Sequence, residues 1–455
     1  MTRSWCAALL FCLSGSAAAF ACTFGANDFK VVPAAAGGAA GSAGSTGEGG
    51  AAGENAGCVK HDSVPLLVLS AADLHQASVD RFAMVPGTAE VFAIAFVTIP
   101  NGAVMQTHAL IRTIADANFG TVRGIADMTM PGTFLFGGAW ATATEIDIVG
   151  ADQRGIVQLT VPINALGNAD LSMKTNLVVT TLDTPVDCAQ TVHSLRIARN
   201  ITGTPSFVAT CVPDATKPTE YSLWYDTPGL TKTTQLGVTG ANVDNIARFF
   251  VRNGPSGATT NLILVGNDGT AASDFRTGNS PTELKTVSAL TMTTDPGWLQ
   301  QVQAVGLPAA DGGAFMMVTK FHDPTKSVTP LEVWAGSIAS SAYGLLTAVP
   351  PTQLKLVTTA SSAADAFFPQ EWTIRGSSVH VVAEDQISQH NLVLWTLDQS
   401  GGPLSATFPV YSSVTSGNVL TNPRIAQLTL ADVVGWVETS SSAGSVVYAS
   451  SISCP

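Results

Sequence analysis

The chain has 455 residues, of which 46% are hydrophobic and 12% charged, and its formal net charge is -12 at pH 7. The charged share is about half of the roughly 25% that is usual in soluble domains, and Gly, Ser and Thr, which suit strands and turns, take its place. Binding to phosphate backbones needs clustered Lys and Arg, and because the sequence has no such cluster we expect no nucleic-acid partner. It also predicts no membrane-spanning helix, because no apolar run approaches the roughly 20 residues that one needs.

The N-terminal 22 residues read MTRSWCAALLFCLSGSAAAFAC. Arg3 gives a short positive region, residues 5–13 form an apolar core, and Ala19-Phe20-Ala21 offers a small-x-small cleavage site. This order is typical of a secretory signal peptide, and the apolar core is too short for a membrane anchor. We therefore expect residues 1–21 to be removed during export.

Cys22 follows the expected cleavage site directly, and the stretch around it resembles a bacterial lipobox. The resemblance implies that Cys22 carries a lipid, which would be the only contact of the protein with a membrane. The cysteines beyond the signal are odd in number, an unusual count for an oxidising compartment: Cys22, Cys58, Cys188, Cys211 and Cys454. Lipidation of Cys22 leaves four that can pair, and free secretion is the alternative.

Residues 22–57 form the next segment, in which 18 of the 24 residues at positions 34–57 are Gly or Ala. With so little apolar bulk, the segment cannot offset the chain entropy lost on folding, and we expect a disordered tether. Such tracts are similar to the stalks of exported surface lipoproteins from Gram-negative bacteria. The resemblance implies a location at the outer membrane or cell surface, or secretion.

From Lys60 onward the sequence predicts strands almost throughout. Apolar runs of five to eight residues, rich in Val, Ile, Phe and Thr, are bounded by Gly, Pro, Asn or Asp, which are strand signals. Two short segments, Ser70 to Asp80 and Leu299 to Val305, have a helical pattern instead. Many short strands with even turn spacing are typical of a sandwich, a barrel or a propeller.

A repeated pair of strands favours the propeller. The second strand of each pair often has an aromatic residue at its centre, and the centres are Leu110, Asp147, Trp224, Leu264, Trp334, Trp395 and Tyr448. The first, more apolar strands begin near Val91, Thr133, Ser206, Ala247, Ala314, Val379 and Asp432. A mean spacing of about 56 residues fits four strands with their turns. We therefore predict an all-β fold, a single β-propeller over residues 58–455, with seven blades favoured, six or eight possible, and stacked β-sandwiches as the competing fold.

Ring closure is expected at the ends of this domain. The strand from Val64 to Ser70 has no partner nearby in sequence and can complete the last blade. That pairing would bring Cys58 next to Cys454, so we predict a Cys58–Cys454 disulfide and a second one between Cys188 and Cys211. The recurring aromatic residues are expected to pack between blades.

The sequence carries none of the catalytic motifs G-x-S-x-G, H-E-x-x-H, C-x-x-C or a Gly-rich phosphate loop. We therefore predict no catalytic residue, metal or cofactor. Three weak candidates for a functional site stand in the sequence. The group His380, Glu384, Asp385 and His390 could bind a divalent metal, His322 could act as a ligand, and Glu371 beside Trp372 could reach the propeller funnel.

The function predicted from these observations is that of a non-enzymatic cell-surface or secreted scaffold. As a monomer, it would present a propeller face to a protein or a glycan. The alternative is a secreted polysaccharide hydrolase or lyase that uses carboxylates in the propeller funnel. An envelope component without any ligand is a third possibility.

Overall fold

The computed structural model describes the domain between residues 58 and 454 with gaps, and the predicted signal peptide, Cys22 and the predicted tether lie outside the described residues. The described ranges are 58–61, 63–69, 79–88, 90–101, 104–114, 122–131, 133–152, 154–163, 178–181, 192–199, 205–211, 221–226, 234–239, 245–253, 260–267, 273–278, 285–290, 298–306, 314–322, 331–338, 354–360, 367–385, 390–413, 415, 417–440 and 444–454. Within these ranges every regular element is a strand, and no helix is long and apolar enough to cross a membrane.

The described strands form seven antiparallel sheets, which we number blades 1 to 7 in chain order. Blade 1 consists of β3 (Val79–Pro86), β4 (Val91–Asn101), β5 (Val104–Ile114) and β6 (Val122–Pro131). Blade 2 consists of β7 (Leu135–Ala141), β8 (Glu145–Asp152), β9 (Gly155–Pro162) and β10 (Val178–Thr181). Blade 3 consists of β11 (Val192–Arg199), β12 (Pro205–Cys211), β13 (Tyr221–Asp226) and β14 (Thr234–Thr239).

Blade 4 consists of β15 (Asn245–Asn253), β16 (Thr260–Asn267), β17 (Ser273–Gly278) and β18 (Lys285–Leu290). Blade 5 consists of β19 (Trp298–Gly306), β20 (Ala314–His322), β21 (Leu331–Ile338) and β22 (Lys355–Ala360). Blade 6 consists of β23 (Phe367–Arg375), β24 (Ser378–Asp385), β25 (Asn391–Asp398) and β26 (Phe408–Ser412). Blade 7 combines β27 (Val419–Gln427), β28 (Asp432–Ser440) and β29 (Gly444–Ser453) with the N-terminal strands β1 (Val59–Lys60) and β2 (Val64–Leu69).

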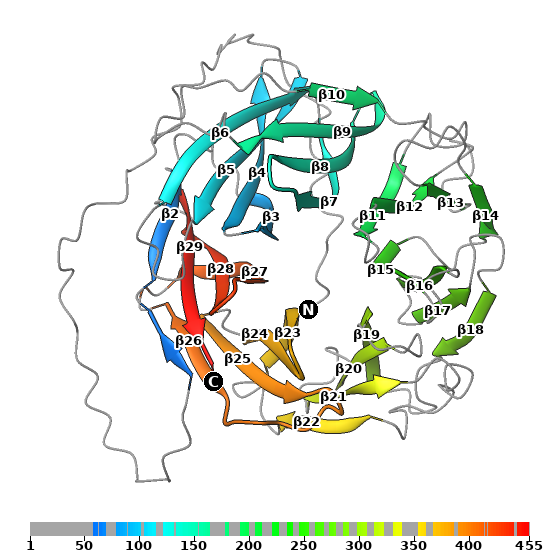
Figure 1. Cartoon of the computed structure of the whole chain (residues 1–455), viewed down its shortest axis with the longest axis vertical. Coiled ribbons are helices and arrows are strands. Elements are labelled where there is room, and N and C mark those ends of the chain that lie inside the picture. Colours follow the sequence, from blue (N-terminus) through cyan, green and yellow to red (C-terminus); the bar gives the residue numbers. More distant parts are fainter. Residues whose placement is uncertain are drawn as a thin grey trace, which may run out of the picture.

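The blades follow one another around a central axis, with the first strand of each nearest the centre (Figure 1). Inner strands touch between most successive blades, and β27 of blade 7 contacts β3 of blade 1. This arrangement confirms the β-propeller class and excludes stacked sandwiches. The Leu299 to Val305 segment, predicted to be helical, is instead part of strand β19, because its pairing with β20 along the whole strand overrides a local pattern.

The hydrophobic cores lie between blades. One cluster joins Leu66, Leu69 and Val433 of blade 7 to Phe82 and Val97 of blade 1. Others join blade 1 to blade 2, blade 2 to blade 3, blade 5 to blade 6, and blade 6 to blade 7. A blade covered on both faces needs apolar residues on both sides of its middle strands, and β4 is buried from Val91 to Val97 and again at Ile99.

The aromatic residues of the repeat were expected between blades, and two of them are found there. Trp395 belongs to the cluster between blades 5 and 6, and Tyr448 packs against the cluster between blades 6 and 7. The Trp334 indole N–H donates to Glu332 Oε2 at 3.2 Å. The Trp224 side chain lies outside the described residues.

Blade 7 closes the ring with strands from both ends of the domain, as predicted. Strand β2 pairs antiparallel with β29, from Val64 opposite Ala449 to Leu69 opposite Ser445. Pro65 has no amide hydrogen, and an outermost strand is the place where a sheet tolerates it. The buried guanidinium of Arg112 in blade 1 donates from Nε to the Leu66 carbonyl at 2.9 Å, and burial lowers its pKa to about 10.

The predicted Cys58–Cys454 disulfide is present and links positions 396 residues apart. Cys211 is also disulfide-bonded, whereas Cys188 lies outside the described residues, so the pairing of these two stays a prediction. The first disulfide covalently locks the seam that β2 and β29 form.

Replacing both Cys58 and Cys454 by Ser is expected to lower the free energy of unfolding by up to about 5 kcal/mol, since the crosslink restricts a very long loop in the unfolded chain. Urea unfolding followed by tryptophan fluorescence measures the loss. The matched variant Cys211→Ser removes a disulfide away from the seam and should cost less. Equal midpoints for wild type and the double variant would show that the crosslink does not hold the ring.

Candidate functional site

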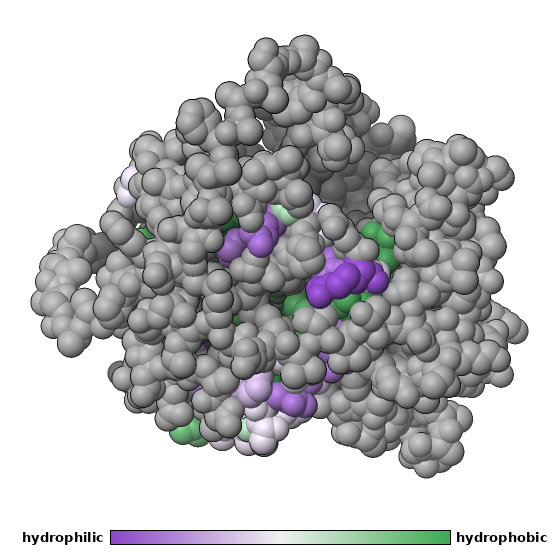
Figure 2. All heavy atoms as spheres, turned by 90° about the horizontal axis from the view of Figure 1, so that it is seen from above, coloured by the Kyte–Doolittle hydropathy of each residue, from purple (hydrophilic) through white to green (hydrophobic). Residues whose placement is uncertain are grey.

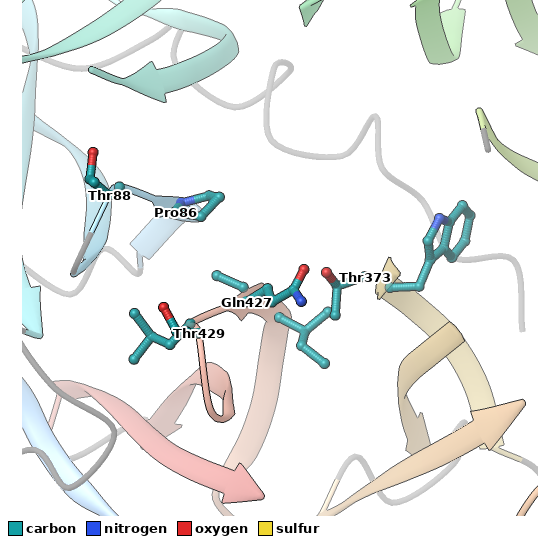
Figure 3. A pocket seen from close by; sticks show the side chains of 10 residues that line it. Pro86, Thr88, Thr373, Gln427 and Thr429 are labelled. Atoms are coloured by element: carbon teal, nitrogen blue, oxygen red, sulfur yellow. The ribbon is translucent and has the colours of Figure 1, made fainter. Parts of the chain in front are cut away.

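A pocket opens where the inner strands of blades 6, 7 and 1 end, next to the central axis (Figure 3). Its volume is about 400 Å³. The described residues that line it are Pro86, Gly87, Thr88, Trp372, Thr373, Ile425, Ala426, Gln427, Leu428 and Thr429. Figure 3 shows the side chains of Thr88, Thr373 and Gln427 placed around the same opening, each from a different blade.

The described lining combines apolar surface with neutral hydrogen-bonding groups. Trp372 and Ile425 are each 6% exposed, so the pocket reaches down to the hydrophobic packing between blades. Thr88, Thr373 and Gln427 supply hydroxyl and amide groups that can both donate and accept hydrogen bonds. Hydrophilic and hydrophobic residues also lie side by side on the surface seen in Figure 2. The mixed lining of the pocket itself is typical of small-molecule sites, in which a few polar groups orient a ligand against an apolar wall.

Two arginines fix the walls of this pocket by bonding backbone carbonyls of the next blade. Arg375 of blade 6 donates to the carbonyls of Thr429 and Leu428 at 3.0 and 2.8 Å. Arg424 of blade 7 donates from Nε to the Phe82 carbonyl in blade 1 at 3.1 Å. These bonds tie the three blades together at the pocket, so the described walls of the site are held in place before a ligand binds.

A buried polar chain runs beside the same wall. His380 Nδ1 bonds Asp432 Oδ2, and Arg375 forms an ion pair with Asp432 Oδ1 at 3.3 Å. His380 Nε2 lies 3.1 Å from the Ser378 hydroxyl, which donates to the Arg375 carbonyl at 2.8 Å. His380 and Asp432 are each 1% exposed. The chain joins blade 6 to blade 7 and satisfies charges that would be costly to bury alone.

The histidine and carboxylate group suggested by the sequence is divided among separate roles. His380 bonds Asp432 of the next blade, while Asp385 Oδ2 accepts from the backbone amides of His390 and Asn391 at 3.0 and 2.8 Å. No three such groups within the described residues lie close enough to hold a metal ion. The side chain of His322, in β20, lies outside the described residues.

Two carboxylates lie on the inner strands β3 and β23 among the described residues, namely Asp80 and Glu371. Asp80 precedes the pocket residue Pro86 by six positions, or about 20 Å along an extended strand. Loss of solvent raises its pKa, and hydrogen bonds with Thr98 act in the opposite direction. Glu371 directly precedes the pocket residues Trp372 and Thr373. Of the candidates named from the sequence, Trp372 lines the pocket, and Glu371 precedes it on β23 without being one of the lining residues.

A second polar network lies at the other end of the blade 6 to blade 7 interface. Glu438 accepts hydrogen bonds from Tyr411 at 2.8 Å, Ser413 at 2.6 Å and Asn418 at 2.8 Å. Burial raises the pKa of Glu438, but these three hydrogen bonds outweigh it and bring the pKa below the ordinary 4.5. The same carboxylate raises the pKa of Tyr411, in addition to the larger effect of burial.

Glu438 should therefore contribute stability above its ordinary pKa of 4.5, and this contribution should vanish as the pH falls through the lower pKa of the folded state. Glu438→Gln is expected to flatten the loss of stability on acidification below about pH 4.5. Thermal unfolding measured between neutral and acidic pH tests this, with Glu145→Gln, at the start of β8, as the control. Parallel pH profiles for wild type and Glu438→Gln would contradict it.

No protein-family model matches the chain, and no curated protein is significantly similar to it. Similar solved structures include polysaccharide lyase Uly1, at 9% identity and a TM-score of 0.46, covering 83% of this chain and 90% of that one. An α-L-arabinanase of Penicillium chrysogenum complexed with arabinobiose has 9% identity and a TM-score of 0.41, covering 86% and 98%. The β-propeller domain of the Trilobed protease from Pyrococcus furiosus has 8% identity and a TM-score of 0.38, covering 82% and 92%.

Most of these similar structures are carbohydrate-active enzymes, among them also a family-43 glycoside hydrolase, a GH62 hydrolase and a GH93 α-L-arabinofuranosidase. This finding contradicts the non-enzymatic scaffold expected from the sequence and favours its alternative, a polysaccharide hydrolase or lyase. The scaffold expectation rested on the absence of short catalytic motifs, and that absence does not exclude catalysis. Propeller sites gather residues from several blades and leave no such motif.

Proposed function

We propose that the protein is a polysaccharide hydrolase that holds a glycan chain in the pocket between blades 6, 7 and 1. The observation that supports this most directly is the lining of the pocket. Trp372 and Ile425 offer apolar surface, while Thr88, Thr373 and Gln427 offer neutral donors and acceptors.

A sugar ring has complementary chemistry, with C–H groups on its faces and hydroxyls around its edge. Apolar side chains pack against the faces, and neutral hydroxyl and amide groups exchange hydrogen bonds with the edge. A volume of about 400 Å³ is in the range of small-ligand pockets and suits a short segment of a longer chain. Neutral polysaccharides fit this described lining best.

Glu371 is the carboxylate that we assign to proton transfer at the glycosidic bond. It lies on the inner strand β23, directly before two lining residues, Trp372 and Thr373. A positioned carboxyl group that donates or accepts a proton in the transition state typically accelerates such a reaction by about 10² to 10⁴. Strand β23 is held on both sides, by its ladder with β24 and by its contact with β27, so its side chains keep their positions.

Glu371→Gln should lower kcat/KM for polysaccharide cleavage by about 10²-fold or more and leave the unfolding temperature nearly unchanged. Gln427→Ala should raise KM by about tenfold with little change in kcat, since it removes a hydrogen bond to bound sugar. The assay is release of reducing ends from arabinan, xylan and other neutral polysaccharides, with ultraviolet absorbance reporting the unsaturated products of a lyase.

The matched control is Glu145→Gln, a similar change in blade 2 away from the pocket, which should retain wild-type activity. Failure of the folded wild-type protein to cleave any polysaccharide of the panel would overturn the proposed function. Equal activities of Glu371→Gln and wild type would remove Glu371 from the mechanism.

We also propose that the protein is exported and that Cys22 carries the lipid that the lipobox-like stretch implies. The Gly/Ala-rich residues that follow would then hold the propeller away from the membrane and near extracellular polysaccharide. Expression in a Gram-negative host followed by membrane fractionation tests this, because Cys22→Ser should move the protein from the membrane to the soluble fraction. An unchanged membrane fraction would contradict lipidation.

A further inference from the structure

Three side chains beside the pocket have the connectivity of a nucleophile, a base and an orienting acid. The Ser378 hydroxyl lies 3.1 Å from His380 Nε2, and the opposite ring nitrogen, Nδ1, bonds Asp432 Oδ2. Each nitrogen of the imidazole thus faces one partner, a hydroxyl on one side and a carboxylate on the other. This is the set of contacts by which a serine hydroxyl is activated in acyl-transfer enzymes on unrelated folds.

The local fold produces this geometry from a short hairpin and a neighbouring blade. Ser378 and His380 are two positions apart on β24, so their side chains lie on the same face of the strand. That face meets Asp432, the first residue of β28 in blade 7. Arg375 binds the other carboxylate oxygen of Asp432 at 3.3 Å, which fixes the acid in place.

The hydroxyl lies where a substrate can reach it. His380 and Asp432 are each 1% exposed, whereas Ser378 is only partly buried and lies at the end of the β23–β24 turn. A Cβ built on Gly376 in that turn meets no atom within 4 Å, so the space beside the turn is open. Arg375, which pairs with Ser378 across the ladder, binds the carbonyls of the pocket residues Leu428 and Thr429.

We propose that Ser378 is the nucleophile of an acyl-ester hydrolase site, with His380 as general base and Asp432 as the group that orients it. The substrate class is a short acyl ester of a sugar hydroxyl, such as an O-acetyl group on a glycan. The assignment of the alcohol as a sugar rests on the proposed function, whereas ester cleavage itself does not. The sequence gives no sign of this site because it lacks the usual G-x-S-x-G motif.

In the reaction, the Ser378 oxygen forms a bond to the acyl carbon while its proton passes to His380 Nε2. The hydroxyl has two acceptors in reach, the Arg375 carbonyl at 2.8 Å and Nε2 at 3.1 Å, and it turns from the first to the second. The carbonyl electron pair moves to oxygen and returns as the ester C–O bond breaks. The leaving alcohol takes the proton from Nε2.

Water then completes the cycle. It attacks the acyl-serine and gives a proton to His380, and collapse of the second tetrahedral intermediate releases the carboxylic acid and returns the proton to Ser378. Asp432 stabilises the imidazolium in both halves and stays ionised. The net reaction is ester plus water to acid plus alcohol, with no further reactant.

The test uses the folded wild-type protein, a fluorophosphonate probe and p-nitrophenyl acetate. Peptide mass spectrometry should find the probe on Ser378, and Ser378→Ala should abolish labelling and lower ester hydrolysis by at least about 10³-fold. Asp432→Asn should lower kcat by a similar factor, since it leaves the imidazole in the wrong tautomer. Ser377→Ala changes the exposed neighbouring serine and is the control, with wild-type labelling and rate expected.

Ser378→Ala keeps the contact of His380 with Asp432 and with it the link between the blades, so its unfolding temperature should stay close to that of wild type. Absence of probe on Ser378 in the folded protein, or equal ester hydrolysis by wild type and Ser378→Ala, would overturn the proposal. Acetate release from an O-acetylated xylan that depends on Ser378 but not on Glu371 would support it. Hydrolysis of p-nitrophenyl acetate without any action on polysaccharides would support the ester site and contradict the glycan function.

Discussion

Pairing of β2 with β29 is the contact on which the rest of the molecule depends. It joins strands from opposite ends of the domain and places β27 of blade 7 against β3 of blade 1. The pocket has Pro86 and Thr88 on one side of that junction and Gln427 on the other. A propeller that opened at this seam would lose the pocket as well as the cores beside it. The Cys58–Cys454 disulfide restricts the conformations of the unfolded chain, so it stabilises the pocket together with the closed ring.

The all-β ring could be predicted because a strand covered on both faces leaves a clear apolar run in the sequence. Which two strands of each blade form the repeated pair could not be predicted from the sequence. In blades 1, 3, 5, 6 and 7 the paired runs are the second and third strands, whereas in blades 2 and 4 they are the first and second, so Asp147 and Leu264 lie on β8 and β16. This shift by one strand explains the uneven spacings of 37 and 77 residues on either side of Asp147. Inner strands such as β7 carry enough apolar residues to resemble a middle strand, since they too pack against neighbouring blades.

The candidate site was harder to predict because its residues approach one another across blades rather than along the chain. The sequence grouped His380 with Glu384, Asp385 and His390, which are close in number, and suggested a metal. On a strand, however, Asp385 points to the opposite face from His380, and the actual partner of His380 is Asp432, 52 positions away in the next blade. The spacing of Ser378 and His380 by two residues was a usable signal, although a serine and a histidine at that spacing gain meaning only with a carboxylate opposite them.

The residues of the polar chain beside the pocket contribute unequally to the stability of the fold. Arg375, His380 and Asp432 carry the link between blades 6 and 7, and removing one partner of such a buried pair typically costs about 3–5 kcal/mol because it leaves a charge unpaired. Ser378 stands at the end of this chain and contributes a neutral hydrogen bond, worth about 1 kcal/mol. The groups that hold the imidazole in place therefore also hold blade 6 against blade 7, and of the four side chains only the Ser378 hydroxyl can be removed without weakening that contact. Ser378 therefore adds little to the stability of the fold, and its hydroxyl is available for the reaction proposed above.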